Sequence, residues 1–209
     1  MKKSLSAESP RSRRQEYAEL TRRAIVDAAR KLFREHGYFS TKVDDIAALA
    51  RVAPATVYAV SAGKQGLLRT LVDSWSTAPV IESTARSIDE LDDPEAIIRL
   101  IAATCCGMRK EYGDIVHLIL NTAPHDAEVA AALATGTDRY RKALRRNGRR
   151  LVELGALREG IDLNQAVDVL WFYFGYSGLF TLVDDNGWSY ERAEKWLGDE
   201  AVRALLHKK

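Results

Sequence analysis

The spacing of apolar residues predicts a chain built from helices. Apolar side chains recur every three or four residues in most segments, as they do on the buried face of an amphipathic helix. The first run covers residues 16–36, and Gly37 is placed to end it. Its apolar stripe consists of Leu20, Ala24, Ile25, Ala28, Ala29, Leu32 and Phe33. No segment suggests a strand, so we expect an all-α fold.

Two short helices joined by a tight turn are predicted next. Thr41 is expected to cap the first helix with its hydroxyl. Asp44 lies three residues further on, where its carboxylate can accept a hydrogen bond from the backbone N–H of Thr41. Pro54 suits the first turn of the second helix, because proline lacks the N–H that would be unpaired there. Residues 51–53 connect the two. This is the outline of a DNA-binding helix-turn-helix.

The second short helix, residues 54–60, has an outer side of small or polar residues. A helix of small residues can lie deep in a major groove, hydroxyls can reach phosphates, and methyl groups can contact thymine. The residues of this outer side are Ala55, Thr56, Tyr58 and Ala59. A purely structural helical hairpin fits the spacing about equally well, so the flanking residues must decide.

The flanks resemble the N-terminal domain of the tetracycline-repressor (TetR) family over residues 21–72. The resemblance rests on Ile25-Val26-Asp27-Ala28-Ala29, Leu32-Phe33, His36-Gly37-Tyr38, Thr41, Val43-Asp44-Asp45-Ile46-Ala47, Ala53-Pro54-Ala55-Thr56-Val57-Tyr58, Lys64 and Leu67-Leu68. The chain departs from the family pattern after Tyr58. The family usually has a His-Phe pair where this chain has Val60-Ser61, so a phosphate-contacting His and a packing aromatic are absent.

The resemblance implies a three-helix helix-turn-helix domain followed by a helical ligand-binding and dimerisation domain. We expect a disordered basic tail over residues 1–15, the DNA-binding domain over 16–63 and the regulatory domain over 64–209. The resemblance further implies that Ala55 and Thr56 face bases while Thr41, Tyr58 and Lys64 hold phosphates. The full set of expected DNA-contacting residues is Thr41, Lys42, Pro54, Ala55, Thr56, Tyr58 and Lys64.

The second half of the chain is predicted from pattern alone. Residues 76–93 contain Pro79, several Ser and Thr and an Asp pair, which indicates an irregular stretch. Helices are expected over about 94–111, 115–121, 126–154 and 162–185, and a last amphipathic helix is expected to start after Ser189. The basic run within 139–150 is interpreted as a solvated helix face rather than a second nucleic-acid surface.

The segment 162–185 is apolar on nearly all sides, so we expect it to be buried on nearly all sides. In the TetR family the last two helices of each subunit form a four-helix dimer interface, and Gly175 and Gly178 would let another helix approach closely. By this resemblance the chain is a homodimer. The expected interface residues are Gly175, Gly178, Leu182, Trp188, Trp196 and Leu197.

A small-molecule pocket is expected between the helices of the second half, again by resemblance. Aromatic side chains and isolated polar groups on apolar helices are its candidates, although each is individually more typical of core or interface. They predict an apolar or aromatic ligand. The candidate pocket residues are Trp75, Met108, His117, Asn121, Tyr140, Trp171, Phe174 and Tyr176.

Charge is distributed unevenly along the chain, which supports a nucleic-acid-binding domain in its N-terminal part. The net charge of +2 divides into +7 over residues 1–70 and −5 over residues 71–209. A basic segment attached to an acidic remainder suits DNA binding by the first part.

Catalytic and metal-binding patterns are not visible in the sequence. The four His residues are scattered, and Cys105 and Cys106 are adjacent, so we expect reduced thiols, no metal, no cofactor and no enzymatic activity. The start of the chain lacks the apolar run of a secretory signal, and we expect no apolar stretch to reach the ~20 residues of a membrane span. The predicted location is the cytoplasm.

The sequence therefore predicts a TetR-like transcriptional regulator, expected to act as a repressor. As a dimer it would bind double-stranded DNA at a palindromic operator, and a small ligand would release it. A helical ligand-binding or scaffold protein that no longer binds DNA remains the alternative, supported by Val60-Ser61 alone. A helical enzyme is a third class, and a dependence of activity on His117 but not on Tyr58 would favour it.

Overall fold

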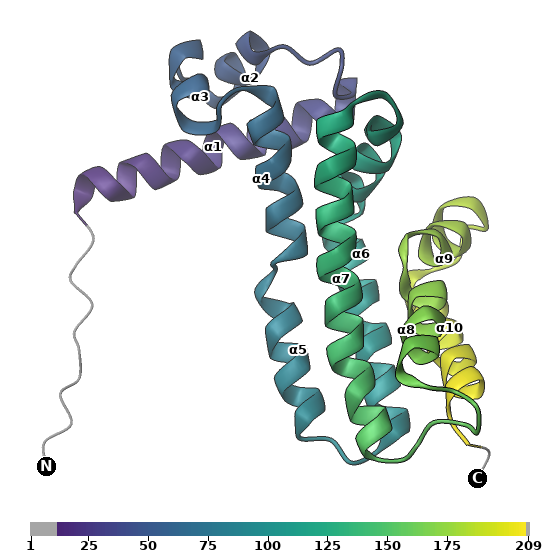
Figure 1. The fold of residues 1–209 in the computed structure, drawn as a ribbon. Coiled ribbons are helices and arrows are strands. Elements are labelled where there is room, and N and C mark those ends of the chain that lie inside the picture. Colours follow the sequence, from purple (N-terminus) through teal and green to yellow (C-terminus); the bar gives the residue numbers. More distant parts are fainter. Residues whose placement is uncertain (1–11, 208–209) are drawn as a thin grey trace, which may run out of the picture. The chain divides into compact units, whose positions relative to one another are not determined.

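The computed structural model describes residues 12–207, and the chain divides after Thr70 into two compact units. Helices make up the regular structure of both units (Figure 1). Leu157 and Leu206 also form an isolated antiparallel bridge. The expected all-α class is confirmed. The tail expected over residues 1–15 lies mostly outside the described residues.

The first unit is a three-helix arrangement that continues into a fourth helix. It contains α1 (Arg13–His36), α2 (Val43–Ala50), α3 (Pro54–Ser61) and the start of α4 (Lys64–Ser76) (Figure 1). Helix α2 packs against both α1 and α3. The fully buried core of the unit consists of Ile25, Ala29, Phe33, Ile46, Ala47, Val57, Leu67 and Leu68.

Helix α1 starts earlier than predicted and is buried over a shorter length. Ser12 and Gln15 form a reciprocal capping box, so the helix begins at Arg13 rather than near residue 16. The predicted apolar stripe was wrong at its beginning. Leu20 is 60% exposed and Ala24 is exposed, because the helices of this unit cover only the later turns of α1.

The predicted cap of α2 was also wrong. Thr41 is buried, and its hydroxyl donates to the backbone carbonyls of Gly37 and Leu32 instead of accepting from α2. Lys42 takes the cap position, and the Asp45 carboxylate accepts from the Lys42 backbone N–H at 3.3 Å. Thr41 therefore ties the beginning of α2 to the end of α1.

The second unit surrounds a long central helix. Helix α6 (Pro94–Thr122) packs against α5, α7, α8, α9 and α10. The remaining elements are α5 (Pro79–Asp89), η1 (Ala123–His125), α7 (Ala127–Glu153), α8 (Leu163–Phe174), α9 (Tyr176–Phe180), the π-helical turn η2 (Thr181–Asp185) and α10 (Tyr190–Leu205) (Figure 1).

Two predicted boundaries in this unit were wrong. The stretch expected to be irregular contains α5, which starts at Pro79 and buries Thr84, Ala85 and Ile88 on one face. The helices expected over 94–111 and 115–121 are one helix, α6, which runs through Gly113. A glycine inside a helix costs only about 1 kcal/mol relative to Ala, and the apolar face on either side of Gly113 outweighs that cost.

The apolar segment 162–185 is neither continuous nor fully buried within one chain. Asp162 caps α8 as predicted, but the helix ends at Gly175. Phe172 is 75% exposed, so part of the outer face of α8 is uncovered. By length and composition Leu163–Asp185 is able to cross a membrane, contrary to the expectation for this sequence. Core helices of soluble proteins share this length and composition, and Ala166, Leu170 and Phe174 are fully buried here.

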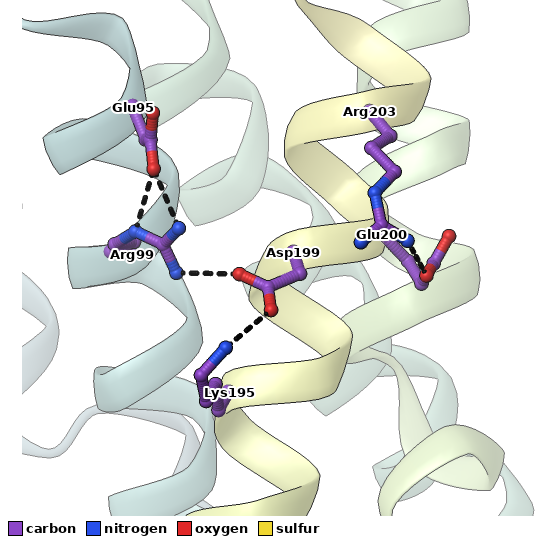
Figure 2. A network of polar contacts seen from close by, with 6 residues as sticks. All are labelled: Glu95, Arg99, Lys195, Asp199, Glu200 and Arg203. Carbon is purple, nitrogen blue, oxygen red and sulfur yellow. Dashed lines mark hydrogen bonds and ion pairs between the residues drawn. The ribbon is translucent and has the colours of Figure 1, made fainter.

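Ion pairs connect the helices of the second unit at its surface. Figure 2 shows Arg99 of α6 bound to Glu95 of its own helix and to Asp199 of α10, which also accepts from Lys195. These donors hold the pKa of Asp199 below its usual value.

The basic face of α7 is paired with acids of neighbouring helices. Arg146 reaches Glu82 of α5 at 2.7 Å, and Arg139 reaches Asp73 at 2.6 Å. The basic run within residues 139–150 therefore forms part of the packing between helices. Exposed pairs of this kind stabilise little individually, so they chiefly fix the geometry.

Candidate nucleic-acid interface and ligand cavity

Helix α3 presents an uncharged outer face. Val57 is fully buried and fixes the helix on the first unit, while Thr56 is half-buried. Apart from Tyr58, which is 57% exposed, the outer residues carry very small side chains or a proline ring. The exposed residues are Pro54, Ala55, Tyr58 and Ala59. Such a face can approach base edges closely, with the Tyr58 hydroxyl as its polar group.

Lys64 lies at the start of α4 and is directed into the first unit. Its ammonium group donates to the backbone carbonyls of Tyr38 at 2.7 Å, Phe39 at 3.3 Å and Thr41 at 3.1 Å. It also lies 4.4 Å from the centre of the Tyr38 ring. Lys64 therefore joins the α1–α2 connection to the start of α4. Its expected phosphate contact stays a prediction, and an exposed lysine beside α2, Lys42, is a more accessible donor.

The turn after α3 forms without the aromatic that the family usually has there. The Ser61 hydroxyl donates to the carbonyl of Val57 at 2.7 Å and so closes the last turn of α3. Ala62 adopts the left-handed conformation, with φ of 55°. A Cβ on Gly66 would overlap the carbonyl oxygen of Ser61, so only glycine fits where α4 passes the end of α3.

A narrow cavity of about 50 Å³ lies among α4, α5, α6 and α7 of the second unit. Its walls are mostly apolar. Polar groups enter it from α5, α6 and α7, namely those of Thr84, Thr104, Arg109, Tyr140 and Asn147. Known small-molecule pockets measure roughly 300–1,000 Å³, so a ligand of ordinary size requires this cavity to open.

The eight predicted pocket residues lie in three places. Trp75, Met108 and Tyr140 line the cavity. Trp171 and Tyr176 join Trp75 and Tyr140 in an aromatic cluster whose ring centres are 5.1 to 6.3 Å apart.

The other three lie away from the cavity wall. Phe174 is fully buried in the core. His117 stacks on Phe180 at 3.6 Å and pairs with Asp184 at 2.9 Å, while Asn121 is exposed near the end of α6. The sequence thus predicted aromatic residues of the cavity wall, but not its polar residues Thr84, Thr104, Arg109 and Asn147.

Arg109 is the most unusual residue of the cavity, and sequence reasoning missed it. Its side chain is buried, and burial lowers its pKa. One terminal nitrogen, Nη2, donates to the carbonyl of Gly175 at 3.3 Å, and the other, Nη1, has no hydrogen-bond partner. Its position on α6, in line with Ile98, Ala102 and Cys105 on the buried face, is the sequence signal that marks it.

The predicted dimer residues lie between the end of α8 and the middle of α10. Leu182 and Leu197 are buried within their own chain, whereas Trp196 is 42% exposed and packs edge-on against Trp188 at 5.9 Å.

The two glycines of this segment do not open a gap for another helix. A Cβ on Gly175 would lie 2.4 Å from the Trp171 carbonyl oxygen, and one on Gly178 would lie 2.8 Å from that of Tyr173. The backbone of their own segment therefore occupies the space beside both glycines.

The surroundings of the two cysteines disfavour the reactive thiolate form. Both are buried and free, and desolvation raises the pKa of Cys105 to about 11 and that of Cys106 to about 12. Thiols with such pKa values stay protonated near neutral pH, which suits a packing role. Within residues 12–207, no three Cys, His, Asp or Glu side chains gather into a metal-binding group.

Comparison with known proteins agrees with these features. Residues 25–71 match the family model of bacterial regulatory proteins, tetR family. None of the curated proteins matches the sequence.

Three solved structures illustrate the similarity of fold, each less than 25% identical to this chain. SmeT of Stenotrophomonas maltophilia, solved with triclosan, is 22% identical with a TM-score of 0.76, and the alignment covers 90% of this chain and 92% of SmeT. FadR of Bacillus subtilis, solved with stearoyl-CoA, is 18% identical with a TM-score of 0.70, covering 88% and 99%. A regulator of Saccharomonospora viridis, solved with choline, is 15% identical with a TM-score of 0.73, covering 91% and 100%.

The first unit is thus a helix-turn-helix DNA-binding domain in a protein with the fold of ligand-binding regulators. The match to the tetR family covers residues 25–71, and the chain as a whole has the fold of solved regulators of this family.

Proposed function

We propose that this chain is a repressor that binds a palindromic operator as a homodimer in the cytoplasm and leaves it when a small molecule occupies the second unit. The observation that carries the proposal is the exposed face of α3, with Ala55, Tyr58 and Ala59 free to meet DNA in a unit of the matching family. Two half-sites roughly 34–36 Å apart, or a multiple of this, follow from a two-fold dimer.

DNA contacts divide into base and phosphate contacts in this proposal. Ala55 and Thr56 face bases, and Pro54 brings the start of α3 to the groove. Tyr58 and Lys42 contact phosphates with their side chains. Thr41 and Lys64 have their polar groups engaged within the first unit, so they support the interface through the geometry of the α1–α2 connection.

The uncovered outer face of α8 supports the dimer. Phe172 and Trp196 leave apolar surface exposed on α8 and α10 in the single chain, and a second copy would cover it. Gly175, Gly178, Leu182, Trp188 and Leu197 belong to the same segment and shape that face from within.

Ligand release requires that the ligand favour a form of the dimer with wrongly spaced DNA-binding units. The narrow cavity supports such coupling, because a molecule larger than about 50 Å³ has to move the helices around it. Structures of the same fold contain triclosan, choline and stearoyl-CoA, which supports a small-molecule ligand here as well.

A scaffold that no longer binds DNA is the second candidate, and Val60-Ser61 is the observation in its favour. The Ser61 hydroxyl closes the last turn of α3, so the altered pair is compatible with a formed helix. DNA binding itself has to decide between the two candidates.

The test is selection of binding sites from random duplex DNA by the purified protein, followed by titration of the selected duplex at two salt concentrations. We expect an inverted repeat and an affinity that falls steeply with salt. Tyr58→Phe should weaken binding about a hundredfold or more, since it removes two charge-assisted hydrogen bonds per dimer, each of about 1.5 kcal/mol or more.

Lys42→Ala should reduce the salt slope by about one for each phosphate that Lys42 neutralises, or about two per dimer. Lys110→Ala removes an exposed charge from the second unit and serves as the matched control, with an unchanged slope. No enrichment of any duplex by a folded protein would favour the scaffold.

A further inference from the structure

Arg109 is a buried cation without a buried anion. Tyr140, Tyr176, Tyr190 and Cys105 are the ionisable groups that act on its pKa, and none of them is a carboxylate. Its closest aromatic neighbour is the ring of Phe180, whose centre lies 4.2 Å from the guanidinium carbon. A buried charge is strongly destabilising unless it is paired, so its retention here needs a reason.

Part of that reason is the broken helix α8. Where α8 ends, the carbonyls of Phe174 and Gly175 lose their helical donors, and Tyr140 and Arg109 supply replacements at 2.6 and 3.3 Å. This role uses one edge of the guanidinium. Nη1 is left without a partner although the residue is only 5% exposed and lines the cavity.

A second polar atom in the cavity wall is also unsatisfied. Asn147 of α7 is 8% exposed and its Oδ1 has no hydrogen-bond partner. Buried polar groups in proteins nearly always have partners, and Nη1 and Oδ1 are the two such side-chain atoms found within residues 12–207. Both belong to residues of the same cavity, but Nη1 needs an acceptor and Oδ1 needs a donor, so an anion bound there would complete only the arginine.

The cavity adjoins an outer groove that has room for an apolar chain. The groove has a volume of about 470 Å³ and runs between α5 and α6, past Val80, Leu100 and Gly107, and Ser83, Ser87 and Glu111 also line it. Thr84, Thr104 and Met108 line both spaces, and the two threonine hydroxyls lie 2.9 Å apart. A molecule that separates these hydroxyls would have its head beside Arg109 and its body between α5 and α6.

We propose that the regulatory ligand of this protein is an amphipathic anion, with a carboxylate-type head bound to Nη1 of Arg109 and an apolar body in the groove between α5 and α6. Each terminal nitrogen of a guanidinium carries two N–H groups, so both of those on Nη1 are available to such a head, while Nη2 gives one of its own to Gly175. This inference rests on the proposed function for its regulatory meaning, but the binding itself does not depend on DNA.

The test compares octanoate with 1-octanol, which has the same chain length and no charge. Binding to the full chain is measured at neutral pH by calorimetry. We expect octanoate to bind about ten- to a hundredfold more tightly than octanol, as for a hydrogen bond to a charged group. Arg109→Met should abolish this preference without weakening octanol, and Arg109→Lys should restore part of it.

Two control variants separate the parts of the proposal. Lys110→Met removes an exposed charge from the neighbouring position of α6 and should leave the preference intact. Gly107→Leu should weaken octanoate, because added atoms at Gly107 meet nothing within 4 Å and would fill the groove. Unchanged octanoate affinity in Gly107→Leu would contradict the placement of the chain.

Equal affinity of the wild-type protein for both probes, or a preference that survives Arg109→Met, would overturn the anion site. DNA binding by the same preparations is measured in parallel. Binding of the selected duplex without an octanoate preference would refute only the ligand class. An Arg109-dependent preference in a protein that ignores DNA would refute the proposed function and leave the anion site standing.

Discussion

Each unit of this protein turns one cation toward its interior, half-buried Lys64 in the first and buried Arg109 in the second, and their hydrogen bonding differs. In the first unit, the Lys64 ammonium donates to three backbone carbonyls and lies over the Tyr38 ring. In the second, the Arg109 guanidinium donates to one carbonyl and leaves Nη1 unpaired. A satisfied cation holds a fold together, whereas an unsatisfied one is available to a ligand. The difference separates a structural residue from a binding residue.

Replacing Lys64 should give the largest effect. Lys64→Met leaves the carbonyls of Tyr38 and Thr41 without their donor, and we expect the free energy of unfolding to fall by about 3 kcal/mol, as for the loss of charged hydrogen bonds. Urea denaturation followed by circular dichroism measures it. Lys42→Met removes an exposed charge nearby and should change stability by less than about 0.5 kcal/mol. Equal losses in the two variants would contradict the structural role of Lys64.

A smaller effect is expected from the thiol beside Arg109. Because burial raises the pKa of Cys105 from 9.0 to about 11, the folded form holds its proton where the unfolded form loses it. The resulting stability is complete below about pH 9 and is lost as the pH rises toward 11. At about 1.4 kcal/mol per unit of pKa the full loss is just under ~3 kcal/mol, of which about 2 kcal/mol is reached by pH 11.

The measurement is urea denaturation at several pH values between about 8 and about 11, where thiols ionise. Cys105→Ala removes the pH-dependent stability that the thiol contributes and leaves the contributions of other titrating groups. The difference in unfolding free energy between the two proteins therefore reports the thiol alone. A difference that does not vary with pH would show that water reaches Cys105 and therefore the wall around Arg109.

The smallest effect has the opposite sign. Arg109→Met removes an incompletely paired buried charge and fills similar volume, so the ligand-free protein should gain about 1 kcal/mol or stay unchanged. The same denaturation series measures it. A loss comparable with that of Lys64→Met would mean that Arg109 serves the fold as Lys64 does, and the contrast between the two units would disappear.

The first unit was predictable from sequence because its signals are local. Pro54 at the start of α3, the buried Val57 and the turn at residues 51–53 lie within a few residues of one another, and the structure has them as expected. Lys64 was recognised as a fixed position of the motif. Its partners lie 23 to 26 residues away, so the sequence alone did not show that it faces inward.

The second unit was less predictable because its site depends on packing between distant segments. The aromatic residues near the cavity were found by their apolar surroundings. Arg109 was missed, since an arginine in a helix is ordinarily exposed, and its partner Gly175 lies 66 residues away. The break of α8 at Gly175 was also missed, because the apolar run continues across it.

The most direct test of the regulator itself is the mass of its DNA complex. Sedimentation of the chain with the selected duplex should give two protomers per inverted repeat, or a multiple of two, with no complex on a duplex in which both half-sites are scrambled. A single protomer bound per duplex, or equal binding to the scrambled duplex, would contradict a dimer that reads a palindrome.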